Sequence, residues 1–137
     1  MRSKATLALL PLLLFFVFAV TAQQKVAATT GAKPKLMIES LEHSFGTVKP
    51  GTPLTYTFKI VNKGDAELQI TNVAPSCGCT TSNFDKVVAP GKTGGITLAV
   101  EKTESYKGEI TKTATVTTND ADHQTFTLTL RATFQAD

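Results

Sequence analysis

Apolar and polar residues alternate with a period of two along most of the chain after residue 35. This alternation is typical of β-strands that bury one face and expose the other, and we find no helical period in that part of the chain. The segments that carry the strand pattern are residues 36–41, 55–60, 68–73, 80–88, 96–100, 113–117 and 126–134. They predict about seven short strands, of which residues 80–88 form an edge strand.

Turn residues separate these segments. Gly, Pro, Asn and Asp, which favour turns, concentrate in residues 49–53, 62–65, 89–92 and 119–122. The pattern predicts an all-β fold, an immunoglobulin-like two-sheet antiparallel sandwich in which each sheet has one dry face. A closed barrel is the alternative architecture. The chain has no Trp, so the Cys…Trp…Cys signature of immunoglobulin cores is absent and the likeness is one of architecture.

The start of the chain has the three parts of a secretory signal peptide. Arg2 and Lys4 precede an uncharged apolar run over residues 5–20, and Val20-Thr21-Ala22 supplies small residues before a cleavage point. The apolar run is shorter than the roughly 20 residues that span a bilayer. We therefore expect residues 1–22 to be removed, leaving an exported protein, periplasmic or secreted, with no membrane span. No Cys follows the cleavage point to carry a lipid.

Residues 23–35 contain small and polar residues and predict a flexible leader before a domain over residues 36–137. Loss of Arg2 and Lys4 with the signal lowers the formal charge from +3 to +1. The remaining chain has no cluster of Lys and Arg, which argues against nucleic acid or an anionic membrane as a partner.

Cys77-Gly78-Cys79 is the one local motif with chemical content. In an exported chain, two cysteines this close can form a disulfide in a tight turn, and Gly78 would supply the unusual backbone angles of that turn. A three-residue ring constrains the unfolded chain little, by about 1.5 kcal/mol. The bond would thus lock the turn locally or act as an easily reduced redox pair.

Two alternatives to the disulfide stay open. The Cys77 and Cys79 thiolates could bind Cu(I), although the only histidines, His43 and His123, show no ligand spacing with them. The two cysteines could instead remain reduced as small apolar side chains. We assign no metal and no cofactor on this pattern alone.

Other polar residues have simpler structural explanations. The many Thr residues after residue 110 suit the wet face of strands. No Ser has the strand–turn–helix context of a catalytic nucleophile. Asp120 and Asp122 could contact calcium, but two carboxylates in a turn usually reflect turn chemistry. We therefore predict no catalytic residues and no enzymatic activity.

A set of short motifs resembles one known family. They are Phe45-Gly46-Thr47-Val48 with Gly51, residues 58–64 (FKIVNKG), residues 75–80 (PSCGCT), Ala89-Pro90-Gly91 and residues 117–120 (TTND). Together these motifs resemble the domain of unknown function 1573 family over about residues 36–134. The resemblance implies an exported bacterial protein with a sandwich similar to the domains of the major sperm protein and cilium-associated class, which are binding and scaffolding modules. It implies no catalytic residue.

Taken together, the sequence predicts an exported, non-enzymatic binding or structural module of the cell envelope, whose partner is another envelope protein. Antiparallel sheet edges could take up a strand of that partner. The alternative is a thiol-redox or copper-handling protein that uses Cys77 and Cys79.

Overall fold

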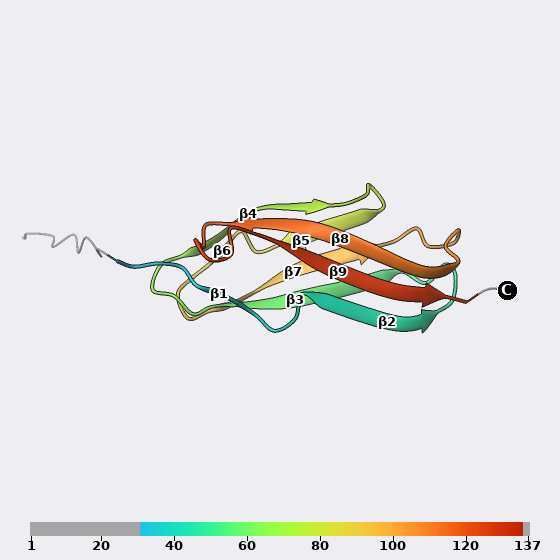
Figure 1. Cartoon of the computed structure of the whole chain (residues 1–137), viewed down its shortest axis with the longest axis horizontal. Coiled ribbons are helices and arrows are strands. Elements are labelled where there is room, and N and C mark those ends of the chain that lie inside the picture. Colours follow the sequence, from blue (N-terminus) through green and yellow to red (C-terminus); the bar gives the residue numbers. More distant parts are fainter. Residues whose placement is uncertain (1–30, 136–137) are drawn as a thin grey trace, which may run out of the picture.

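Two β-sheets pack face to face in the computed structural model, which describes residues 31–135 (Figure 1). The first sheet has the order β1 (Leu36–Ile38), β3 (Leu54–Asn62), β7 (Thr93–Val100), β5 (Thr80–Phe84). The second has the order β2 (Glu42–Val48), β9 (Thr125–Phe134), β8 (Gly108–Thr118), β4 (Leu68–Pro75), β6 (Val87–Val88). The predicted signal peptide and the leader up to residue 30 lie outside the described residues.

The all-β sandwich of immunoglobulin type is confirmed, with two differences in detail. Residues 31–135 form nine strands, because residues 42–48, which follow the first predicted strand, form a further strand, β2, and residues 80–88 divide into β5 and β6. The sandwich is also not entirely antiparallel, since β2 pairs parallel with β9. β1 pairs antiparallel with β3 in the first sheet. The chain then crosses to the second sheet, where β2 runs in the same direction as β9.

The inward-facing positions of the alternating strands form the core between the sheets. Phe58 on β3 and Leu98 on β7 are each 1% exposed, and Leu128 on β9 is fully buried. The other buried apolar residues of the core are Leu36, Leu54, Ile60, Leu68, Ile70, Val73, Val88, Ile96, Val100, Ala114, Val116, Leu130, Ala132 and Phe134. The period of two in the sequence therefore identifies the dry layer of the sandwich.

Asn62 is a fully buried polar residue at the end of β3. Its Nδ2 donates hydrogen bonds to the carbonyl oxygens of Ala66 (2.7 Å) and Val88 (2.9 Å). Its Oδ1 accepts from the backbone N–H groups of Lys35 (3.2 Å) and Gly64 (3.0 Å). One side chain thus ties the first strand, the β3–β4 turn and β6 together, and it supplies partners that buried polar groups require.

The chain before β1 is hydrogen-bonded over the β3–β4 turn. The N–H of Lys63 donates to the carbonyl of Lys35 (2.8 Å), and the N–H of Asp65 donates to that of Lys33 (3.0 Å). These bonds begin three residues before residue 36, where the sequence pattern of the domain begins. Because the segment crosses so closely, a Cβ on Gly64 would lie 2.5 Å from the amide nitrogen of Lys35.

Replacing Gly64 with alanine is therefore expected to lower the free energy of unfolding by about 1–3 kcal/mol, the usual range for overpacking. Gly78→Ala is the matched control, because a Cβ there meets nothing within 4 Å. It should change stability by less than about 0.5 kcal/mol. Urea unfolding followed by circular dichroism measures both, and equal stabilities of the two variants would contradict the close approach at Gly64.

Candidate functional site

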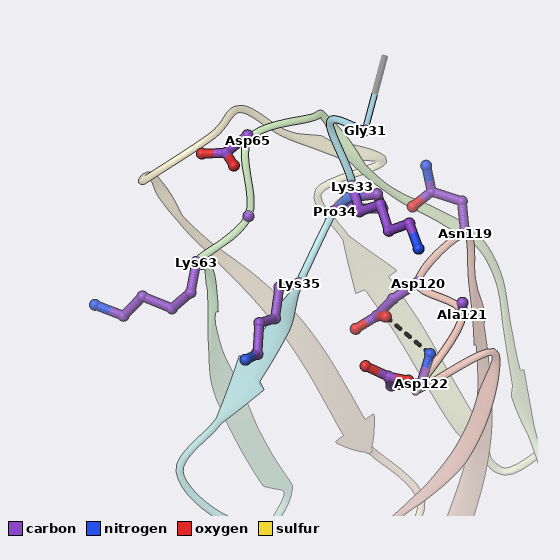
Figure 2. A pocket seen from close by; sticks show the side chains of 11 residues that line it. Gly31, Lys33, Pro34, Lys35, Lys63, Asp65, Asn119, Asp120, Ala121 and Asp122 are labelled. Carbon is purple, nitrogen blue, oxygen red and sulfur yellow. Dashed lines mark hydrogen bonds between the residues drawn. The ribbon is translucent and has the colours of Figure 1, made fainter. Parts of the chain in front are cut away.

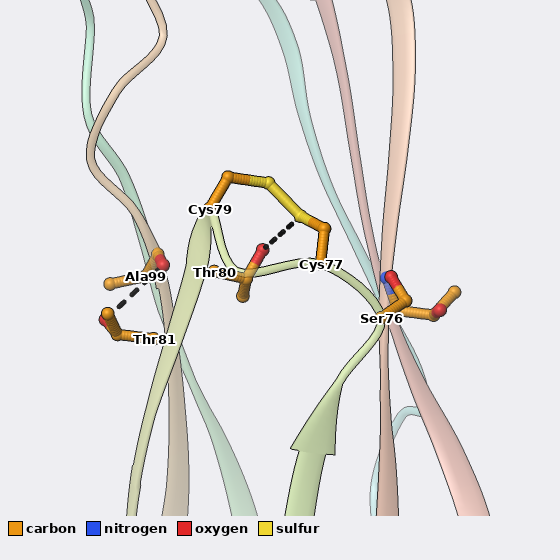
Figure 3. Close-up of a disulfide and its surroundings, with 7 residues drawn as sticks. Ser76, Cys77, Cys79, Thr80, Thr81 and Ala99 are labelled. Atoms are coloured by element: carbon orange, nitrogen blue, oxygen red, sulfur yellow. Dashed lines mark hydrogen bonds between the residues drawn. A yellow bond between two sulfur atoms is a disulfide. The ribbon is translucent and has the colours of Figure 1, made fainter.

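The Cys77-Gly78-Cys79 loop joins the two sheets at one end of the sandwich, between β4 and β5 (Figure 3). The structure joins the two sulfur atoms in a disulfide, with the Cα atoms 5.3 Å apart. Both cysteines are partly exposed and Gly78 is exposed. In Figure 3 the bond arches over the outside of the loop, so it forms part of the molecular surface.

Hydrogen bonds hold both ends of this loop. The N–H of Ser76 donates to the carbonyl of Thr113 on β8 (2.8 Å), which extends the β4–β8 pairing by one residue. The N–H of Thr80 donates to the carbonyl of Cys77 (3.2 Å) and closes the turn from within. Both of these bonds use backbone groups and involve neither sulfur atom.

Thr80 also contacts the disulfide with its side chain. It is only 5% exposed, and its hydroxyl lies 3.7 Å from Cys77 Sγ, within hydrogen-bond distance for sulfur. Among residues 31–135, Cys77 Sγ is the only hydrogen-bond partner of this hydroxyl. The two sulfurs are therefore not equivalent, since in the described part of the chain a hydroxyl neighbours Cys77 Sγ and none neighbours Cys79 Sγ.

The expected role of Gly78 needs correction. Gly78 is not one of the glycines with positive φ, and a Cβ on it would meet no atom within 4 Å. The turn at the disulfide therefore does not require the backbone freedom of glycine, because any L-residue can adopt its conformation. What Gly78 provides is the absence of a side chain beside the exposed disulfide.

Neither histidine joins the cysteines. His43 on β2 stacks on Tyr56 of β3, with ring centroids 3.6 Å apart. His123 lies in the β8–β9 loop at the other end of the sandwich and contacts Asp120. Within the described part of the chain, no group of three or more His, Cys, Asp or Glu residues could hold a metal ion. A Cu(I) site at Cys77 and Cys79 thus has no further ligand of these types there.

The end of the sandwich away from the disulfide carries a cleft of about 430 Å³ between the segment before β1 and the β8–β9 loop (Figure 2). Lys33, Lys35, Asp65 and Asp122 lie at its exposed rim, and Asp120 lies at its base with 2% exposure. Side chains of both signs of charge therefore line this cleft.

Asp120 anchors β1 rather than a ligand. Its Oδ2 accepts a hydrogen bond from the N–H of Leu36 (2.8 Å) and contacts Nδ1 of His123 (3.1 Å), while its Oδ1 accepts from the N–H of Asp122 (3.0 Å). Burial raises the pKa of Asp120, but the hydrogen bonds from Leu36, Asp122 and His123, with the charge interaction of His123, outweigh burial and leave its pKa below the usual value. The carboxylate is thus the favoured form in the fold.

This lowered pKa predicts acid sensitivity. The unfolded chain binds a proton at Asp120 near pH 4, whereas the folded chain does so only at lower pH. The contribution of the Asp120 carboxylate to the free energy of unfolding is therefore present above about pH 4. It is lost as the pH falls through the pKa of Asp120 in the folded chain. Asp120→Asn should cost about 1–3 kcal/mol at pH 7 and lose less stability than the wild type below pH 4. Urea unfolding at several pH values measures this, with the exposed Asp65→Asn as control. A wild-type pH slope in Asp120→Asn would contradict the assignment.

The disulfide itself is expected to contribute little stability. Because its ring contains three residues, the Cys77→Ser, Cys79→Ser double variant should lose no more than about 2 kcal/mol and keep the fold. Thermal unfolding with and without reductant measures the difference. A loss far above this value, or an unfolded variant, would show that the bond is a structural staple.

The side of the sandwich next to the disulfide loop has two unpaired strand edges. β5 is the outer strand of the first sheet, and β6 covers β4 only at Leu68 and Gln69. Between these edges lies a cleft of about 440 Å³, lined by Gln69, Ile70, Thr71, Phe84, Lys86 and Val87. Val87 is 51% exposed there, although it is apolar.

Sequence reasoning found the two cysteines but missed the residues around them. Thr80 follows Cys79 directly, so the sequence places its hydroxyl near the two cysteines. The burial of that hydroxyl depends on the fold and could not be read from the sequence. The anchoring role of Asp120 depends on a contact with Leu36, which is 84 residues away in sequence.

Comparison with known proteins identifies the family. The model of the family described as "Protein of unknown function (DUF1573)" matches residues 36–134. The chain belongs to this family, as the sequence motifs suggested. No curated protein matches the sequence at a significant level.

Solved structures show the same fold. A protein of unknown function from Porphyromonas gingivalis W83 has a TM-score of 0.66 and 20% identity, over 80% of this chain and 51% of that one. The chain thus spans about half the length of that protein. The ASH / PapD-like domain 7 of human CEP192 has a TM-score of 0.56 and 11% identity, over 100% of both chains. The Vibrio cholerae VesB protease has a TM-score of 0.54 and 13% identity, over 76% of this chain and 32% of that one.

These likenesses show the fold alone, and they include both a PapD-like domain and part of a protease. Within the described residues, no helix is long and apolar enough to cross a membrane.

Proposed function

We propose that this DUF1573 protein is an exported, non-enzymatic module that binds an extended segment of another cell-envelope protein along the free edge of β5. The observation that carries the proposal is the pair of uncovered strand edges beside the cleft at Phe84 and Val87. Export is supported by the signal-like pattern of residues 1–22.

The pairing of β5 with β7 tells which backbone groups are free. The N–H of Asp85 donates to the carbonyl of Gly95 (3.1 Å), and the N–H of Gly95 donates to Oδ2 of Asp85 (2.8 Å), so residue 85 turns its backbone N–H toward β7. Because this orientation alternates along an antiparallel ladder, the backbone groups of Ser82 and Phe84 point away from β7. They are available to a further strand.

The facing edge belongs to β4. The bond from Ser76 N–H to Thr113 sets the alternation there, so the backbone of Val73 points away from β8. The Ser82 hydroxyl donates to the Val73 carbonyl (3.4 Å) and links the two edges. Further along β4, the N–H of Ile70 donates to the carbonyl of Lys86 (2.9 Å), so the edge of β4 is covered there.

An extended peptide fits these two features together. Its backbone would pair with Ser82 and Phe84, and an apolar side chain could enter the cleft beside Ile70, Phe84 and Val87. Exposed edges of this kind favour strand addition. The polar side chains of Thr81 and Asn83 on the outer face keep the edge wet in the free protein.

The absence of an assembled catalytic set supports a non-enzymatic role. Among residues 31–135, the two histidines are engaged with Tyr56 and Asp120, and neither contacts a serine or cysteine nucleophile. Asp120 itself is fully engaged by backbone donors and His123. Binding is therefore the function that the described surface supports best.

Ser82→Pro tests the edge directly. Proline removes the outward N–H of residue 82 without taking a donor from the β5–β7 ladder, which edge strands tolerate. Affinity capture from a cell-envelope extract of the source organism should retain a partner with the wild type and lose it, by about tenfold or more, with Ser82→Pro. The tenfold figure corresponds to about 1.4 kcal/mol, one hydrogen bond.

Ser82→Ala is the matched control, because it removes the hydroxyl bond to Val73 and keeps the backbone N–H. It should bind like the wild type. Equal capture by Ser82→Pro would place binding elsewhere on the molecule, and turnover of a substrate by the purified protein would refute the non-enzymatic role.

A further inference from the structure

The Cys77–Cys79 disulfide combines three properties that distinguish it from a structural cross-link. It lies on the surface of a loop whose ends are held by the backbone bonds of Ser76 and Thr80. Its ring is too small to constrain the unfolded chain much. One of its sulfurs, Cys77 Sγ, has the buried Thr80 hydroxyl beside it at 3.7 Å.

We propose that this disulfide exchanges with a protein dithiol, with Cys79 as the attacked sulfur and Cys77 as the leaving thiolate. This inference does not depend on the binding edge of β5.

The Thr80 hydroxyl determines which of the two sulfurs is attacked and which one leaves. A hydroxyl group that donates to a thiolate stabilises the charged form, so it makes that sulfur the better leaving group. Because the hydroxyl is buried and has no other partner among the described residues, its hydrogen is free to turn to Cys77 Sγ. Within residues 31–135 no hydroxyl donates to Cys79 Sγ, so negative charge is less stable there.

The exchange balances without a further reactant. A thiolate of the partner dithiol attacks Cys79 Sγ, a bond forms between these sulfurs, and the bond to Cys77 breaks with its electron pair on Cys77 Sγ, which takes up a proton. The partner's second thiol loses its proton and attacks the partner's first sulfur, releasing Cys79 as a thiolate that takes up a proton. The partner dithiol is oxidised to a disulfide, and Cys77 and Cys79 are reduced to thiols.

The loop keeps its conformation when the disulfide is reduced and reoxidised. The backbone bond from Thr80 N–H to the Cys77 carbonyl (3.2 Å) closes the turn without the disulfide. The Cα atoms are held 5.3 Å apart, within the range that a disulfide needs, so the reduced thiols stay close enough to be reoxidised. Opening the bond moves no strand, since β4 and β5 are fixed by their pairing with β8 and β7.

Glutathione, a monothiol, reads out the attacked sulfur in the wild-type protein. The oxidised protein is mixed briefly with glutathione, and free thiols are alkylated with iodoacetamide at once. The peptide that contains both cysteines is then fragmented by tandem mass spectrometry, because only fragments that separate Cys77 from Cys79 assign each label. Glutathione should be found on Cys79 and the alkyl group on Cys77, in an excess of about threefold or more, as expected for one hydrogen bond to the leaving thiolate. Equal labelling, or glutathione mainly on Cys77, would overturn the assignment.

The Thr80 variants test the cause. Thr80→Val should slow the reaction of the disulfide with dithiothreitol by about threefold and abolish the preference for Cys79. Thr80→Ser keeps a hydroxyl and should restore both. A disulfide in the folded wild type that resists millimolar dithiothreitol for hours would overturn the exchange itself, and circular dichroism verifies that each variant is folded.

Discussion

Burial of one face of each sheet against the other is the constraint on which the rest of this structure depends. Side chains such as Phe58 from one sheet and Leu128 from the other fill the dry layer, and water is excluded from it. Backbone groups at the ends of the layer then lose water as well, so they need other partners. Asn62 and Asp120 provide them at the end away from the disulfide. These residues are hydrogen-bonding anchors of the fold.

The same packing leaves the sheet edges as the places where function can reside. On one side the chain crosses from β1 to β2 and closes the sandwich. On the other side it crosses at the Cys77–Cys79 loop and again between β5 and β6, so the edges of β4 and β5 remain uncovered between the two crossings. A strand edge can hydrogen-bond to another chain but cannot by itself perform chemistry. The disulfide is the reactive group on the side of the sandwich that carries the edges of β4 and β5.

Strand positions and the sandwich could be predicted because alternation is a local property that burial imposes on each strand. The strand β2 could not be predicted, since its formation depends on the free edge of β9 in the second sheet. The role of Asp120 also escaped prediction, because a turn residue and a long-range anchor look alike in sequence. For the cysteines, spacing established that a bond was feasible, while the glycine between them suggested a backbone constraint that the structure does not contain.

Thr80 belongs both to the β5 edge and to the surroundings of the disulfide. As the first residue of β5 it is fixed by pairing with Val100, and this pairing buries its side chain. The hydroxyl is thus held beside Cys77 Sγ by the sheet and not by the loop, so reduction of the disulfide does not displace it. A hydroxyl fixed by the sheet favours the same leaving sulfur in every cycle. Because the direction of exchange follows from β-sheet register, it persists as long as the fold does, whether or not a partner strand occupies the edge of β5.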